Sequence, residues 1–186
     1  MTQVSLYGYL KARAGTSYVS LIKDPIFISS MKTARNHIFF ACLSDLTLHV
    51  LNAIHTRNKQ QNFQNLDPLA LLFFTQTLAK APKEVFESLK REEVIKEFEI
   101  NLSKYNWNVT DDFHESFSAS RSALLKWAPI VEEFKILDEE IVSNSIHFKW
   151  LRVCQEFKKL MDFEKIKIDA NLDLPDLIDK EFPKGS

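Results

Sequence analysis

The chain contains very little glycine, since Gly8, Gly15 and Gly185 are the only three among its 186 residues. Ordinary usage of about 7% would give roughly thirteen. Glycine supplies the positive-φ positions of hairpin turns, bulges and phosphate-binding loops. Its absence between residues 16 and 184 therefore disfavours a multi-stranded meander or a dinucleotide-binding fold. Such a chain can still form helices that are joined by corners containing Asn, Asp or Pro.

Several catalytic and cofactor motifs are missing as well. The sequence has no G-x-S-x-G, G-x-x-x-x-G-K-[ST] or G-x-G-x-x-G, no H-E-x-x-H or E-x-x-H, and no C-x-x-C. These absences argue against the corresponding hydrolases, nucleotide-binding proteins and metal enzymes, so we expect no metal and no cofactor. An all-α enzyme whose site is assembled from dispersed residues stays open as a third alternative.

Cysteine is also scarce, and both cysteines, Cys42 and Cys154, lie in apolar helical stretches. We expect them to be small core residues with free thiols. The first ten residues lack a basic segment followed by an apolar run, so no signal peptide is predicted. The most apolar stretch, residues 37–55, is interrupted by Asp45 and His49 and is interpreted as a core helix. The sequence thus predicts a cytoplasmic protein without a membrane span.

The chain is rich in phenylalanine, with fifteen such residues. Hydrophobic residues make up 45% of the sequence and charged residues 26%. Asp24 followed by Pro25 is a typical helix start, with Asp as N-cap and Pro at the first helical position. Apolar residues then recur at steps of three and four as far as Ile54, which predicts a long helix with a break left open. Asp67-Pro68 predicts a second helix start.

The same spacing predicts further helices towards the C-terminus. Thr110 or Asp111 would cap one of them, and Pro129 would end or kink it. Two apolar stripes follow, one over residues 131–141 and one over residues 146–160. They do not share one helix face, so we expect a corner or register change at residues 143–145.

These patterns predict an all-α protein, a single helical bundle of about five to seven helices with an extended N-terminal arm and an acidic C-terminal tail. Residues 1–23 would form the arm or a short helix, and residues 24–168 the helical core domain. Residues 169–186, which carry acidic residues, leucines and two prolines, would form the tail.

The net charge of −1 is unevenly distributed. Residues 1–66 carry seven Lys/Arg and two Asp/Glu, whereas residues 130–186 carry nine and thirteen. The basic third permits a polyanion partner, and the residues that could contact phosphates are Lys32, Arg35, Arg57 and Lys59. A solvated helix face would look the same. The cluster of Asp111, Asp112, His114 and Glu115 could form a metal or acid/base site, but a helix start collects the same residues by capping.

Two segments are candidates for partner contact. Trp107 lies in a predicted corner between Asn106 and Asn108. The tail carries Leu172, Leu174 and Leu177 between acidic residues, a pattern that can dock in a hydrophobic groove or serve only as a solubilising end.

The sequence therefore predicts a non-catalytic helical interaction protein, such as an assembly subunit, adaptor or scaffold. Its partner would be another protein or a further copy of itself, and a small-molecule substrate is not expected. The alternative is a helical RNA-binding coat or nucleocapsid-like protein that uses its basic N-terminal third.

Overall fold

The described residues of the protein are helical throughout. The computed structural model describes residues 2–57, 66–107 and 117–160, and within these ranges it contains no strand. This confirms the predicted all-α bundle. In chain order the elements are α1 (Thr2–Ala14), the 3-10 helix η1 (Gly15–Ser17), α2 (Tyr18–Leu21), α3 (Pro25–Arg57), α4 (Asp67–Ala79), the 3-10 helix η2 (Lys83–Phe86), α5 (Arg91–Ser103), α6 (Ser118–Trp127) and α7 (Glu132–Leu160).

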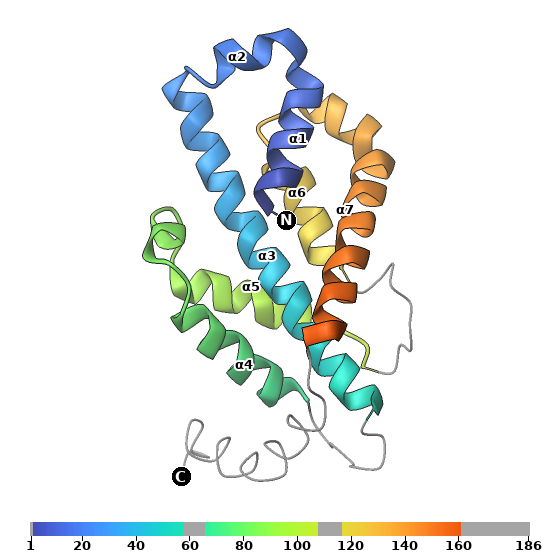
Figure 1. Cartoon of the computed structure of the whole chain (residues 1–186). Coiled ribbons are helices and arrows are strands. Elements are labelled where there is room, and N and C mark those ends of the chain that lie inside the picture. Colours follow the sequence, from blue (N-terminus) through green and yellow to red (C-terminus); the bar gives the residue numbers. More distant parts are fainter. Residues whose placement is uncertain (1, 58–65, 108–116, 161–186) are drawn as a thin grey trace.

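Helix α3 is the spine of the bundle, and its predicted start is confirmed. The Asp24 carboxylate accepts a hydrogen bond from the backbone N–H of Ile26 at 2.9 Å, and Pro25 is the first helical residue. The helix runs for 33 residues without a break, which is about 50 Å. Helices α1, α4, α5 and α6 all pack against it, and Figure 1 shows these helices arranged along its length.

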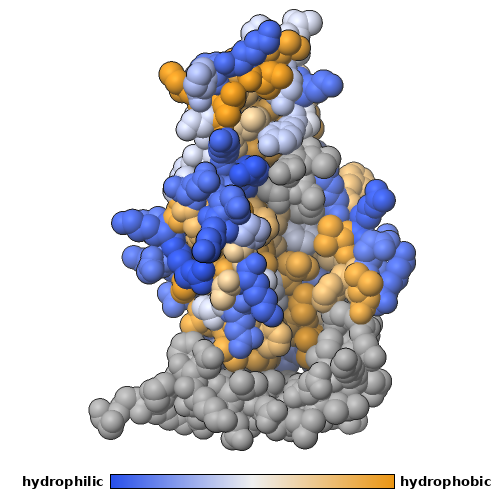
Figure 2. Space-filling view, turned by 60° about the vertical axis from the view of Figure 1, so that its left-hand side comes forward, coloured by the Kyte–Doolittle hydropathy of each residue, from blue (hydrophilic) through white to orange (hydrophobic). Residues whose placement is uncertain are grey.

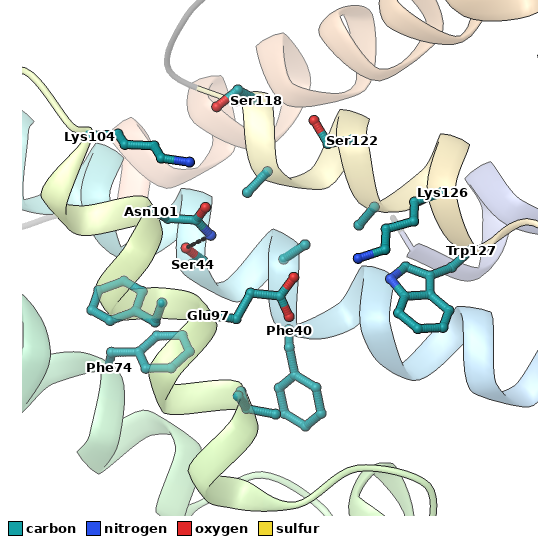
Figure 3. Close-up of a pocket in the computed structure, with 15 residues that line it drawn as sticks. Phe40, Ser44, Phe74, Glu97, Asn101, Lys104, Ser118, Ser122, Lys126 and Trp127 are labelled. Carbon is teal, nitrogen blue, oxygen red and sulfur yellow. Dashed lines mark hydrogen bonds between the residues drawn. The ribbon is translucent and has the colours of Figure 1, made fainter. Parts of the chain in front are cut away.

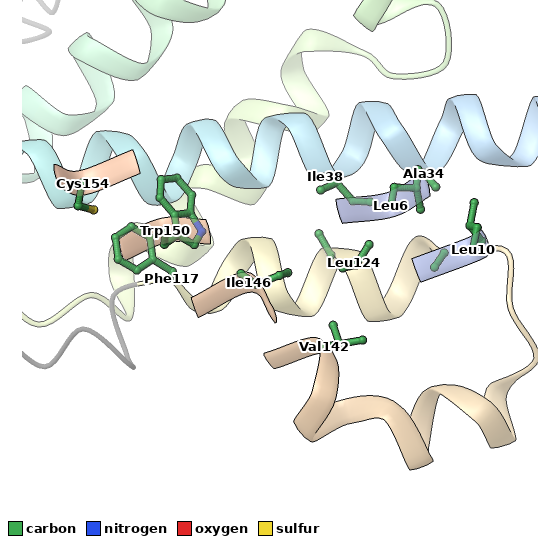
Figure 4. Packing of buried hydrophobic residues seen from close by; sticks show 12 residues of the cluster. Leu6, Leu10, Ala34, Ile38, Phe117, Leu124, Val142, Ile146, Trp150 and Cys154 are labelled. Carbon is green, nitrogen blue, oxygen red and sulfur yellow. The ribbon is translucent and has the colours of Figure 1, made fainter. Parts of the chain in front are cut away.

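The spine is long enough to support two hydrophobic clusters. In the first, buried residues of α1, α3, α6 and α7 meet, including Leu10, Ile38, Leu124 and Trp150 (Figure 4). The second lies between α3, α4 and α5. There the rings of Phe74 and Phe98 stack with their centroids 3.9 Å apart. Each cluster covers a different side of α3, which explains why apolar residues occupy much of that helix's circumference.

The N-terminal segment forms a packed helix, so the extended arm is wrong and the alternative of a short helix holds. Leu6 and Leu10 of α1 are fully buried against α3 and α7. Helix α1 ends before Gly15, whose φ of 53° is a conformation that glycine adopts without a side-chain clash.

Helix α7 differs from the prediction in two respects. It is continuous across residues 143–145, so the expected corner there is wrong. Ser and Asn lower helix propensity only slightly, and Val142 and Ile146 on either side are both buried in the same core. The predicted effect of Pro129 is confirmed, since α6 ends at Trp127 and α7 starts at Glu132.

Candidate functional site

A polar groove opens between α3, α5 and α6 (Figure 3). Its volume is about 310 Å³. Helices α3 and α5 are joined across its floor by the Asn101 amide, which donates to the Ser44 hydroxyl at 3.4 Å. The polar and charged side chains that line it are Ser44, Glu97, Asn101, Lys104, Ser118, Ser122 and Lys126.

The charged side chains of this groove are exposed to solvent. Glu97, Lys104 and Lys126 make no ion pair with any described residue. The Lys126 ammonium lies 5.2 Å from the centre of the Trp127 ring, a cation–π contact. Such a groove could hold a small polar molecule. Its charges face solvent, however, so they carry little of the electrostatic strength of a buried site.

Trp127, which lines the groove, stacks on His37 of α3, with ring centroids 3.4 Å apart and planes within 6°. Burial, and next the positive charge of Lys126, lowers the pKa of His37 to about 4. The imidazole is therefore neutral at neutral pH and acts as an aromatic packing surface.

Below the groove lies a buried carboxylate that the sequence analysis placed only as an interruption of an apolar run. Asp45 accepts hydrogen bonds from the backbone N–H groups of Ala119 (3.2 Å) and Ser120 (2.8 Å) at the start of α6. Burial raises its pKa to about 7, while hydrogen bonds from Ser120 and Ala119 and the charge of Arg121 act in the opposite direction. Asp45 therefore fixes α6, and with it one wall of the groove.

The second candidate site is a row of exposed apolar residues on α7, here called the outer face. Phe134, Leu137, Ile141 and Phe148 are 48%, 73%, 67% and 69% exposed. Asn144 and the half-buried Leu151 continue the row. The sequence predicted an apolar stripe over residues 131–141 that lies on a separate helix from the stripe over residues 146–160. Both stripes belong to the one helix α7. Helices α1 and α6 pack on its opposite side, where Val142, Ile146 and Trp150 are buried, so the stripe over residues 131–141 stays exposed.

In Figure 1, α7 lies at the edge of the described bundle, and α1 and α6 lie on one side of it. A smaller exposed apolar group, Val19, Ile22 and Ile26, lies on and after α2. It forms part of the hydrophobic surface at the top of Figure 2. Spacing alone could not distinguish these surfaces from core, because both consist of the same residue types at the same helical steps.

The predicted phosphate contacts do not gather in one place. Lys32 and Arg35 lie on the first half of α3, and the Arg35 guanidinium contacts the Asn36 side chain at 3.4 Å. Arg57, the last residue of α3, lies about 33 Å farther along the helix axis. Lys59 lies outside the described residues. Contact with nucleic acid by these residues remains a prediction.

Of the predicted partner contacts, only Trp107 is described. Its indole N–H donates to the Asp67 carboxylate at 2.8 Å, and its ring meets Tyr105 edge to face at 4.8 Å. These contacts connect the chain after α5 to the start of α4, and contact of Trp107 with a partner stays a prediction. Leu172, Leu174 and Leu177 lie outside the described residues, as do Asp111, Asp112, His114 and Glu115.

Cys42 and Cys154 are free thiols, and burial raises the pKa of Cys154 to about 11. Among the described residues, no three His, Cys, Asp or Glu side chains come together in a way that could hold a metal ion. Over Pro25–Thr56, α3 is long and apolar enough to cross a membrane, and 44% of its most apolar stretch is buried in the structure. Core helices of soluble proteins meet the same criterion, so this is weak evidence for a span.

Comparison with known proteins adds no further information on function. No family model, curated protein or solved structure matches the chain.

Proposed function

We propose that the protein is a non-catalytic interaction protein, an assembly subunit, adaptor or scaffold, and that the outer face of α7 is its principal contact surface. The supporting observation is the exposure of four large apolar side chains in one row, between 48% and 73% each. Soluble monomers rarely expose contiguous apolar surface of this kind, and where they do it commonly marks a binding site. Burial of each such side chain contributes about 1.5–3 kcal/mol.

The polar groove gives weaker support for an enzymatic function than the outer face gives for an interaction function. A catalytic site of general acid–base type needs a group whose pKa is matched to its task within reach of a second functional group. The groove's lysines and its glutamate are exposed, and Asp45 beneath it is occupied by the backbone of α6. This arrangement suits the positioning of a helix.

Co-purification of the full chain from its own cells, followed by quantitative mass spectrometry, tests the proposal. Ile141→Asp places a charge in the outer face, and Ile136→Asp is the matched control. Ile136 is 70% exposed and lies on the same helix, but five residues before Ile141, which is about 140° around the axis. We expect partners to be lost with Ile141→Asp and retained with Ile136→Asp. Identical partner sets for both variants would contradict the assignment to this face.

The alternative, a coat-like RNA-binding protein, requires a different measurement. If Lys32, Arg35 and Arg57 neutralised phosphates, RNA affinity would fall steeply as salt rises. The logarithm of the association constant would fall with the logarithm of the salt concentration, with a slope near −0.7 for each phosphate contacted on a single strand. Titration of single-stranded RNA over a salt series would reveal this slope. A flat response, or no binding at low salt, would remove this alternative.

A further inference from the structure

The outer face of α7 has the spacing of a coiled-coil seam. Phe134, Leu137, Ile141, Asn144, Phe148 and Leu151 follow one another at alternating steps of three and four residues. These six residues occupy the a and d positions of about two and a half heptads, the pattern by which one helix packs against another. Over these 18 residues the row is about 26 Å long.

Asn144 is the one polar residue in this row, and it lies near its centre. A single Asn at such a position costs stability but fixes the register of the paired helices, because its amide needs a polar partner within reach across the contact. Its place near the middle suits a symmetric pair, since both copies of Asn144 would then lie close to the two-fold axis.

The charges of α7 change sign along the helix. The exposed acids of residues 132–140 are Glu132, Glu133, Glu139 and Glu140, whereas Asp138 is buried and paired with Arg13. The one lysine of this stretch, Lys135, pairs with Glu132 at 3.3 Å. The exposed charges of residues 149–159 are Arg152, Lys158 and Lys159 against one acid, Glu156, whereas the half-buried Lys149 donates to Ser5. A parallel pair of such helices would place like charges together, whereas an antiparallel pair places the acidic half of each beside the basic half of the other.

We infer that the occupant of the outer face is a second copy of this chain, whose α7 packs antiparallel to the first; this rests on the proposed function of the face. In an antiparallel pair each a residue lies at the level of a d residue. Leu137 is then level with Phe148 of the second copy, Phe134 with Leu151 of the second copy, and Ile141 with Asn144 of the second copy. The symmetric, self-complementary contact closes on itself and yields a dimer.

Sedimentation velocity of the full chain from low to high micromolar concentration tests the dimer. We expect a concentration-dependent dimer whose Kd rises at least about 30-fold in Ile141→Asp and in Leu137→Asp, because each substitution acts twice in a symmetric contact. Both side chains are exposed, so an unchanged circular dichroism spectrum shows that the variants are folded. Ile136→Asp should leave the Kd within about threefold of the wild type.

The orientation is measured with a nitroxide label on Glu133→Cys in a Cys42→Ala, Cys154→Ala background. In an antiparallel pair residue 133 of each copy lies level with residue 152 of the other, so the two labels are separated by about 28 Å along the axis. In a parallel pair they would be level, roughly 10 Å apart across the contact.

Each outcome is decisive. A dimer that Ile141→Asp dissociates and whose labels are far apart supports the inference. A wild-type chain that is monomeric at every concentration, a dimer that Ile136→Asp dissociates equally, or labels at short distance would overturn it. If the chain is monomeric and a different protein is nonetheless lost from the Ile141→Asp co-purification, the self-pairing fails and the interaction function stands.

Discussion

The carboxylate of Asp45, on α3, accepts a hydrogen bond from the backbone N–H of Ser120 at 2.8 Å and a second from Ala119 at 3.2 Å. The first N–H groups of a helix have no partner within that helix. Here a side chain from another helix satisfies two of them. The start of α6 is thereby fixed to the spine of the bundle, beside the polar groove.

Removing this carboxylate should destabilise the protein. We expect Asp45→Ala to lower the free energy of unfolding by about 1–3 kcal/mol, because two buried N–H groups lose their acceptor. Asp45→Asn keeps one acceptor oxygen and should lose less. Urea unfolding followed by circular dichroism measures both. If Asp45→Ala stayed within about 0.5 kcal/mol of the wild type, the carboxylate would not be what holds α6 in place.

The protonation of Asp45 should make stability depend on pH. Its pKa is raised from 3.8 to about 7 in the folded protein, so the folded state binds a proton that the unfolded state releases. Stability contributed by this group therefore falls as pH rises from about 4 to about 7. His37 acts in the opposite direction: its pKa is lowered from 6.5 to about 4, so stability is lost as pH falls through that range.

We accordingly expect a shallow pH dependence between about 4 and 6.5 in the wild type, because the two contributions oppose each other. Asp45→Asn should leave the His37 contribution, so that stability rises with pH. His37→Gln should leave the Asp45 contribution, so that stability falls with pH. Urea midpoints in a pH series separate the two slopes, and equal slopes in both variants would contradict this assignment.

A second buried carboxylate connects the N-terminal helix to α7. Asp138 accepts a hydrogen bond from the Tyr9 hydroxyl at 2.9 Å and forms an ion pair with Arg13. The Arg13 guanidinium also lies 5.5 Å from the centre of the Phe134 ring.

We expect Arg13→Ala to cost about 1–3 kcal/mol of unfolding free energy, because it leaves the buried Asp138 charge without its counter-ion. Lys11→Ala, at an exposed position on the same helix, should change it by less than about 0.5 kcal/mol. Guanidinium chloride would screen the ion pair, so urea is the denaturant of choice. If both variants lost the same free energy of unfolding, the Arg13–Asp138 ion pair would contribute no more to stability than an exposed lysine does.

The packing of α1 gives a test of where the folded domain begins. Leu10 is 2% exposed within the first hydrophobic cluster, whereas Val19 is 60% exposed. Leu10→Ala should destabilise the protein by about 2–5 kcal/mol through lost burial and the cavity left behind. Val19→Ala should have a small effect. Thermal unfolding compares the two variants, and a Tm for Leu10→Ala equal to that of the wild type would show that α1 is an appendage.

The helix starts at Asp24-Pro25 and Asp67-Pro68 could be predicted because their signals are local. The Asp24 side chain caps α3, and the fixed φ of proline suits the first turn of both α3 and α4. The break after Trp127 was predictable for the same reason, since Pro129 has no N–H to continue the helix. The continuity of α7 through Asn144 was not predictable, because two apolar stripes at different azimuths look the same whether they belong to one helix or two.

The candidate sites depend on contacts between distant parts of the chain. Glu97 and Lys126 face one groove only because α5 and α6 both pack against α3. No spacing in the sequence relates them. Likewise, an isolated Asp in an apolar stretch does not disclose that it will cap a helix that starts more than seventy residues later.

The sequence by itself determined that this chain is helical, since a backbone nearly without glycine and with apolar residues at steps of three and four favours helices and few other structures. It also set where several helices begin, because those signals act over a single turn. Which apolar stripe becomes core was decided only by the tertiary structure. Helix α7 has two such stripes, and α1 and α6 bury one side, leaving Leu137 and Ile141 at the surface.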